Sequence, residues 1–120
     1  MSKKILIIED HPETAEMIAD ILSFGKIESI IAFNGVLGLQ KALEEKPALI
    51  LLDIMMPEMN GLEVCKRLKA NPETSQIPIV FVSVRSEKQD VTDGKGAGAV
   101  EYVKKPFDPY ELIEVVKRYI

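Results

Sequence analysis

The sequence predicts an α/β domain in which a doubly wound five-stranded parallel sheet carries helices on both faces. Short apolar runs alternate with amphipathic stretches, which is typical of parallel strands joined by right-handed helical crossovers. Three of the runs are almost continuously apolar, as expected of strands covered on both faces. The 120 residues fit one domain, residues 1–120, and are long enough to form a hydrophobic core.

The first half of the chain predicts three strands and two helices. The strand candidates are KILIIED (4–10), ESIIAF (28–33) and ALILLD (48–53). Apolar residues recur at helical spacing over 12–24, and Gly25 stops that helix. An Asn-Gly turn leads into a second helix over 36–46, which Pro47 ends.

The second half predicts two more strands and three helices. The strand candidates are IPIVFVS (77–83) and AVEYV (99–103), and the polar alternation of the second suits a sheet edge. Helices are expected over 62–70 and over 87–97, the latter with two internal glycines. The last helix is expected to begin with Asp108 as N-cap, Pro109 in its first position and Glu111 completing a capping box.

Composition narrows the class of protein. The net charge of -4 argues against direct nucleic-acid binding, which favours a basic surface. The single cysteine, Cys65, allows no internal disulfide and fits a reducing compartment. The first apolar run meets Glu9 after four residues, which is too short for a signal peptide or a membrane span. We therefore expect a cytoplasmic protein without membrane insertion.

Polar residues follow the strands at their carboxyl ends, where sheets of this kind bind ligands. They are Glu9 and Asp10 after the first strand, Asp53 after the third, Ser83 after the fourth, and Lys104, Lys105 and Pro106 after the fifth. If these strands are neighbours, the carboxylates converge and repel one another. A divalent cation removes that repulsion, and Mg²⁺ prefers such oxygen ligands.

This set of groups suits phosphoryl transfer. A metal and the ammonium of Lys105 can stabilise charge on the phosphoryl oxygens, and Ser83 adds a hydrogen-bond donor. The natural nucleophile is a carboxylate held beside the metal. Asp53 fits that role because it ends a buried apolar run, where an unpaired carboxylate would be unfavourable.

Several motifs together resemble one known family. They are the acidic pair Glu9-Asp10, LLDIMMPEMNG around Asp53, Ser83 after the fourth strand, and YVKKPF from Tyr102 to Phe107. The 22-residue step from Ser83 to Lys105 also fits. The chain thus resembles the receiver domain of two-component response regulators, the phosphoacceptor module of bacterial signalling, and in particular the single-domain chemotaxis-type regulators. The resemblance extends from Lys4 to the last helix and implies the flavodoxin-like strand order 2-1-3-4-5.

The resemblance also implies roles for individual residues. Asp53 would be the phosphorylated aspartate, Lys105 and Ser83 would contact the phosphoryl group, and Tyr102 would be the aromatic residue that turns inward with Ser83. Glu9, Asp10, Asp53 and the backbone carbonyl of Met55 would hold Mg²⁺, with Mn²⁺ as a substitute. Pro57, Gly61 and Pro106 would shape the loops, with a cis bond between Lys105 and Pro106.

The implied function is a phosphorylation-activated switch. Such a protein is not an enzyme for outside substrates, but it assists its own phosphorylation and dephosphorylation. A sensor histidine kinase, a phosphotransfer protein or a small phosphodonor would supply the phosphoryl group. The face formed by the fourth helix, the fifth strand and the fifth helix would meet an unknown downstream protein. The resemblance is compatible with a monomer or with a phosphorylation-dependent dimer.

Two functions from other classes stay open at this point. A flavodoxin-like binder of small ligands would need a phosphate-binding loop after the first strand, but EDHPET is acidic and has no glycine. A metal-dependent phosphatase would need a substrate cavity or a cap domain, for which 120 residues leave little room.

Other polar residues have ordinary interpretations. His11 lies next to the acidic pair and could be a metal ligand or a phosphodonor, but a solvated or helix-capping role is expected because Mg²⁺ prefers oxygen. Cys65 is expected to be small core filler. Lys66, Arg67 and Lys69 are expected on a solvated helix face.

Val84 departs from the small residue usual in the family, and we expect it to lie beside the path to Asp53.

Overall fold

The computed structural model describes residues 4–85 and 87–120. The strands are β1 (Ile5–Ile8), β2 (Ser29–Ala32), β3 (Leu49–Leu52), β4 (Ile79–Ser83) and β5 (Glu101–Lys104). The helices are α1 (Pro12–Phe24), α2 (Gly35–Glu45), α3 (Gly61–Ala70), α4 (Lys88–Gly96) and α5 (Pro109–Lys117). All paired strands are parallel, in the order β2-β1-β3-β4-β5. The predicted fold class and strand order are confirmed, with β5 at an edge.

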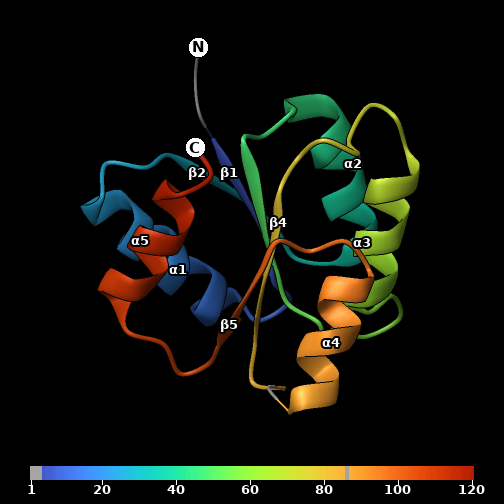
Figure 1. Ribbon diagram of the computed structural model, residues 1–120. Helices are drawn as coiled ribbons and strands as arrows, with labels where there is room; N and C mark the ends of the chain where they lie inside the picture. Colours follow the sequence, from blue (N-terminus) through green and yellow to red (C-terminus); the bar gives the residue numbers. More distant parts are fainter. Residues whose placement is uncertain (1–3, 86) are drawn as a thin grey trace.

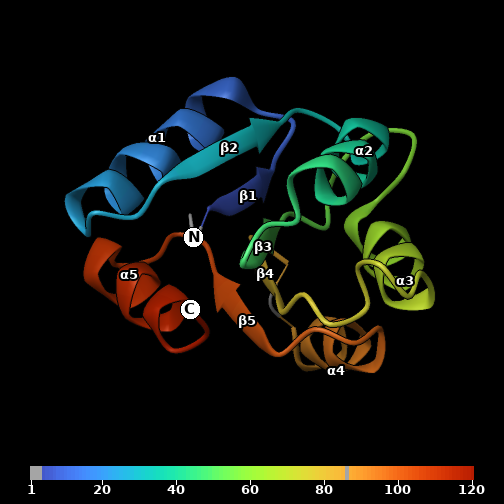
Figure 2. The same ribbon diagram turned by 90° about the horizontal axis from the view of Figure 1, so that it is seen from above.

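The helices form a layer on each face of the sheet. Figures 1 and 2 show α1 and α5 on one face, and α2, α3 and α4 on the other. Each face has its own hydrophobic core, because alternate side chains of the strands point to opposite faces. Every residue of β1, β3 and β4 is buried, as the continuous apolar runs predicted. None of the helices in the described ranges has the length and apolar character needed to cross a membrane.

Side-chain caps set where the helices begin. The Asn34 side chain accepts a hydrogen bond from the Leu37 N–H at 2.8 Å, so α2 begins at Gly35, one residue earlier than predicted. Asn60 caps α3 in the same way, through the Glu63 N–H at 3.1 Å.

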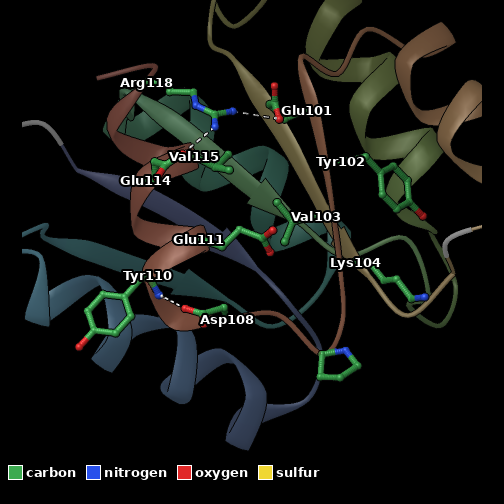
Figure 3. Close-up of a pocket in the computed structure, with 11 residues that line it drawn as sticks. Glu101, Tyr102, Val103, Lys104, Asp108, Tyr110, Glu111, Glu114, Val115 and Arg118 are labelled. Atoms are coloured by element: carbon green, nitrogen blue, oxygen red, sulfur yellow. Dashed lines mark hydrogen bonds and ion pairs between the residues drawn. The ribbon is translucent and has the colours of Figure 1, made fainter.

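The N-terminus of α5 differs in part from its prediction. Asp108 is the N-cap and accepts from the Tyr110 N–H at 2.8 Å, as expected of a capping residue. The predicted capping box is wrong, because no hydrogen bond joins Glu111 to the Asp108 backbone within the described contacts. Glu111 extends instead toward Val103 of β5 (Figure 3). A capping box is found at α4, between Glu87 and Asp90.

The two glycines of α4 have different surroundings. Gly94 is buried, and a Cβ there would lie 3.0 Å from Phe81 Cδ2 and 3.1 Å from Tyr102 Cδ2. Gly94 therefore lets α4 approach the sheet closely. A Cβ at Gly96 would meet no heavy atom within 4 Å, so no packing contact requires a glycine at that position.

The expected solvated face of α3 is partly wrong. Arg67 is exposed and pairs with Glu63 at 2.9 Å, as on a solvated face. Lys69 instead folds back, and its Nζ donates to the carbonyls of Ser75 at 3.0 Å and Ile77 at 2.8 Å. This ammonium satisfies carbonyls of the loop between α3 and β4, which helical spacing could not indicate. Cys65 is fully buried in the core, as expected.

Candidate functional site

The candidate site lies at the carboxyl edge of the sheet, where the ends of β1, β3, β4 and β5 meet. Glu9 follows β1, Asp53 follows β3 and Ser83 ends β4, and these side chains are 2%, 5% and 0% exposed. Buried polar groups of this kind are unfavourable unless they have partners. The partners that these residues have, or lack, therefore indicate what the site can do.

Lys105 brings the main positive charge to this edge. Its Nζ lies 2.6 Å from Glu9 Oε1 and 3.6 Å from Asp53 Oδ2. The peptide bond between Lys105 and Pro106 is cis, and the Lys105 N–H donates to the Ser83 carbonyl at 2.9 Å. The ammonium of Lys105 thus bridges two carboxylates that come from different strands.

The two buried carboxylates differ in acidity. Burial and the charge of Glu9 raise the pKa of Asp53 from 3.8 to about 6, against the opposing effect of Lys105. Burial also acts to raise the pKa of Glu9, but the hydrogen bond and charge of Lys105, with bonds from His11, outweigh it and lower that pKa. Glu9 is therefore the ionised partner of Lys105, and Asp53 is the carboxylate whose negative charge is poorly compensated.

Asp10 and His11 complete a cluster with an unused ligand atom. Asp10 Oδ1 is shielded from water and has no hydrogen-bond partner in the described part of the chain. His11 Nδ1 lies 3.2 Å from Glu9 Oε2 and 3.4 Å from this Asp10 oxygen. One ligand atom from each of Glu9, Asp10, His11 and Asp53 can be chosen so that all lie within 4.8 Å of one another. The orphaned oxygen and the carboxylate-rich donor set fit a divalent cation.

The loop after β3 holds the backbone close around Asp53. The Met55 N–H donates to Asp53 Oδ1 at 3.3 Å, while the Met55 side chain is half exposed. A Cβ at Gly61 would collide with the Asp53 carbonyl oxygen, so only glycine permits this approach of α3. Pro57 lies in the same loop, and its carbonyl accepts from the Met59 N–H at 2.8 Å.

Ser83 is connected to the start of α4 through Arg85. The Ser83 hydroxyl accepts from the Arg85 N–H at 3.2 Å, and the Tyr102 hydroxyl donates to the Arg85 carbonyl. The Arg85 guanidinium pairs with Asp90, at 2.9 Å, in the first turn of α4. The Tyr102 ring packs on Phe81 with centroids 5.9 Å apart, on the side of β5 away from α5 (Figure 3). Residue spacing gives no signal for Arg85, because only the loop geometry joins it to Ser83 and Tyr102.

Two hollows lie near these residues. One of about 380 Å³ is lined by Val84, Lys105 and Pro106 together with residues of α1, so it opens beside the carboxylate cluster. Another of about 850 Å³ lies between β5 and α5, with charges of both signs along its wall (Figure 3). The carboxylate cluster does not line this second hollow, so the two features are separate parts of the surface.

The predicted site residues are largely brought together. Glu9, Asp10, Asp53 and Lys105 form one cluster, with Met55 and Gly61 in the loop around Asp53. Ser83 and Tyr102 meet through the backbone of Arg85. His11, for which a solvated or capping role was expected, stands at the helix start and is 69% exposed, but it makes no side-chain cap bond and its ring faces the acidic pair.

Comparisons with known proteins agree with this arrangement. The family model for the response regulator receiver domain matches residues 5–117. The chain is 38% identical over 117 residues to the DNA-binding response regulator MtrA of Mycolicibacterium smegmatis, covering 98% of this chain and 50% of that protein. It is 35% identical over 120 residues to the polar-differentiation response regulator DivK of Brucella anthropi, covering 100% and 98%. The chain therefore spans about half the length of MtrA and nearly all of DivK.

A solved structure extends the comparison to three dimensions. The chemotaxis protein CheY4 of Vibrio cholerae superposes with a TM-score of 0.93 over the whole of both chains, at 26% identity.

Proposed function

Because this chain belongs to the receiver domains of two-component response regulators, we propose that Asp53 is the residue that accepts the phosphoryl group in this protein. The observation that supports this assignment is the buried Asp53 carboxylate, 3.6 Å from the Lys105 ammonium and within the cluster that fits a cation. The family is a signalling regulator. The proposed role is therefore that of a switch, rather than of an enzyme that turns over outside substrates.

The reaction needs a nucleophile and compensation of negative charge. An Asp53 carboxylate oxygen attacks phosphorus, a new P–O bond forms, and the bond from phosphorus to the donor breaks with its electron pair on the donor. Lys105 is placed to compensate the charge on the phosphoryl oxygens, and the Ser83 hydroxyl can donate to one of them. In dephosphorylation, water attacks phosphorus and gives up a proton to the solvent, the bond from phosphorus to Asp53 breaks, and Asp53 leaves as a carboxylate with inorganic phosphate as the product. The same groups thus assist both phosphorylation and dephosphorylation.

The metal ligands in this proposal are Glu9, Asp10, Asp53 and the backbone carbonyl of Met55. Their oxygens suit Mg²⁺, with Mn²⁺ as a substitute, and the partnerless Asp10 oxygen supports the assignment. When bound, the cation supplies positive charge that offsets the carboxylates and the incoming phosphoryl group. The charge of the cation would also favour the ionised form of Asp53, whose pKa burial raises to about 6.

In this proposal, phosphorylation changes the partner-binding face through the hydrogen bonds that link Ser83 to Arg85 and Tyr102. When the Ser83 hydroxyl turns to a phosphoryl oxygen, it no longer accepts from the Arg85 N–H. Arg85 also carries the Tyr102 hydroxyl bond and the pair with Asp90, so the change reaches β5 and the start of α4. The face formed by α4, β5 and α5 then changes its affinity for a downstream protein.

The phosphodonor in this proposal is a sensor histidine kinase or a phosphotransfer protein in the cytoplasm. Small donors such as acetyl phosphate should serve in vitro. The domain acts as a monomer or as a phosphorylation-dependent dimer, without binding nucleic acid itself.

Intact-mass spectrometry tests the assignment directly. Incubation with acetyl phosphate and Mg²⁺ should give one phosphoryl adduct, which chelation of the metal should abolish. Asp53→Asn should give no adduct. Asp20→Asn makes the same change at an exposed aspartate of α1 and should behave as the original protein.

The same experiment separates the competing functions. Labelling that persists in Asp53→Asn would place the phosphoryl group elsewhere and overturn the proposal. A small-ligand binder would form no adduct, and a phosphatase would release phosphate steadily from outside esters. The acidic loop after β1, which has no glycine and carries the partnerless Asp10 oxygen, favours a cation over a bound cofactor phosphate.

A further inference from the structure

His11 places the only imidazole of this chain at the carboxylate cluster. Its Nδ1 lies between two acidic side chains, 3.2 Å from Glu9 Oε2 and 3.4 Å from Asp10 Oδ1. Ligand atoms on adjacent positions of one cation, each about 2.1 Å from it, stand roughly 3 Å apart. The two distances are therefore those expected of atoms that can share a cation after small adjustments.

The side chain is not committed to another structural role. His11 occupies the N-cap position of α1, yet its side chain makes no cap hydrogen bond. The ring is 69% exposed, so its orientation is not enforced by packing. Among the described residues, the hydrogen-bond and ion-pair partners of the ring are Glu9 and Asp10. The ring is solvated, as one of the two expected roles predicted, but neither solvation nor capping explains why it faces the acidic pair.

We propose that His11 Nδ1 is a metal ligand that makes this a mixed nitrogen and oxygen site, selective for first-row transition ions such as Zn²⁺ over Mg²⁺. The proposal rests on the cation site of the proposed function and adds the residue that sets its metal preference. Imidazole binds Zn²⁺ well, whereas Mg²⁺ prefers oxygen and keeps several waters. An added imidazole should therefore strengthen Zn²⁺ binding and leave Mg²⁺ binding almost unchanged.

The remainder of the chain offers little competition for the probe ion. Cys65 is the only thiol, it is fully buried, and burial raises its pKa to about 11. A thiolate is the form that binds Zn²⁺, so this residue is a poor alternative ligand. Since His11 is the only histidine of the chain, any change of an imidazole signal in untagged protein comes from His11.

Calorimetric titration of untagged, metal-free protein with ZnCl₂ and with MgCl₂ tests the preference. His11→Ala should weaken Zn²⁺ binding by roughly tenfold or more, since even indirect support of a ligand is worth about that much. Its Mg²⁺ affinity should stay within about twofold of the original protein. Asp10→Asn should weaken both ions, and Asp20→Asn neither. Equal Zn²⁺ affinity with and without His11, or equal loss for both ions, overturns the proposal.

A second measurement needs no variant. In the ¹⁵N spectrum of histidine-labelled protein, stoichiometric Zn²⁺ should shift the Nδ1 resonance of His11, whereas Mg²⁺ should leave it in place. Coordination through Nε2, or an unchanged ring, overturns the proposal. Neither result affects the proposed function, whose failure would appear separately as the absence of an Asp53 adduct with acetyl phosphate and Mg²⁺.

Discussion

Val84 shows how one side chain at the rim can control access to the site. It is 59% exposed and lines the smaller hollow together with Lys105 and Pro106. It therefore lies toward α1 and the loop after β5. The competing prediction is that Val84 only packs against α4. We expect a branched side chain at this place to restrict the approach of a phosphodonor and of water to Asp53.

We predict that Val84→Ala accelerates both phosphorylation by small donors and dephosphorylation, by up to about tenfold, a barrier change of about 1.4 kcal/mol. Mg²⁺ affinity should be unchanged, and stability should move by less than about 0.5 kcal/mol because the residue is exposed. Time courses of adduct formation and phosphate release measure the rates. Val36→Ala, at an equally exposed valine of α2, is the matched control. Rates within a factor of about two of the original, with a lower melting temperature, would mean that Val84 is only a packing residue.

Asp53 makes the stability of the metal-free protein depend on pH. Burial and Glu9 raise its pKa from 3.8 to about 6, so folding favours the protonated form. This contribution is fully present below about pH 4 and is lost as the pH rises through about 6. Glu9 has a lowered pKa and acts in the opposite direction, so the test must compare two proteins that both contain it.

We predict that Asp53→Asn is progressively more stable than the original protein as the pH rises from about 4 to 7 in the presence of a chelator. The gain should be on the order of 2–3 kcal/mol, since one pKa unit corresponds to about 1.4 kcal/mol. Urea unfolding across this range measures it. A constant difference between the two proteins would show that Asp53 titrates normally in the folded state.

The positions of the site residues could be predicted where a polar residue follows the end of a strand. The carboxylates, the hydroxyl and Lys105 were predictable because polar residues at the ends of parallel strands must share an edge. The stronger contact of Lys105 with Glu9 than with Asp53 depends on side-chain conformation, which residue spacing does not contain. The same is true of the Lys69 ammonium, which helical spacing placed in solvent.

Among the elements, α4 is held to the rest of the domain by little buried surface. Of residues 88–96, all of which the structure describes, only Gly94 is buried. Burial of apolar surface is the main stabilising contribution to a packed helix, so α4 should open more readily than the other helices. Native-state hydrogen exchange should show it opening first, and protection equal to that of α5 would contradict this.

We predict opposite effects of alanine at the two glycines of α4. Gly96→Ala should stabilise the protein by up to about 0.8–1.0 kcal/mol, because alanine favours the helix and its Cβ meets open space. Gly94→Ala should lose that gain, since its Cβ would press on Phe81 and Tyr102. Urea unfolding of the two variants measures both changes in stability. Equal stabilisation by both would show that α4 does not depend on the close approach of Gly94 to Phe81 and Tyr102.

The elements themselves were predicted well and their ends less well. Strand candidates were drawn one to three residues too long. After β1 and β3 the extra residues include the acids of the site, which lie beyond the strand ends, whereas the extra residues before β4 and β5 belong to the preceding loops. The capping box was assigned to α5, although Asp108 bonds Tyr110 and the box is found at α4. A capping motif in the sequence shows which hydrogen bonds could cap a helix. The path of the loop that precedes the helix decides which of these hydrogen bonds form.

For the molecule as a whole, the acidic cluster lowers the stability of the metal-free fold. Glu9, Asp10 and Asp53 are close enough to share one cation, and Lys105 compensates them only in part. A bound cation removes the remaining repulsion, so binding is coupled to folding.

We predict that Mg²⁺ raises the melting temperature, with about 1.4 kcal/mol of added stability at ten times its dissociation constant. Asp10→Asn should melt higher than the original protein without metal and should lose most of the response to it. Thermal melts with and without millimolar Mg²⁺ test both statements. Superimposable melting curves for the original protein would contradict a cation site in this cluster.

The fold class followed from the alternation of apolar runs and amphipathic stretches, because parallel strands require crossovers. Periodicity alone does not contain the strand order, which came from the resemblance to receiver domains. Once the order β2-β1-β3-β4-β5 is known, the site follows, since it brings the ends of β1, β3, β4 and β5 together.

The contact between Lys105 and Glu9 joins residues 96 positions apart. During synthesis on the ribosome, Glu9, Asp10 and Asp53 emerge well before the ammonium that compensates them. The negative charge of the acidic cluster therefore stays uncompensated by Lys105 until nearly the whole domain has left the exit tunnel. A nascent chain stopped before Lys105 would contain β5 but would lack both this counter-charge and α5. Under the proposed function, Asp53 would therefore become a competent phosphoryl acceptor only when the domain has been completed.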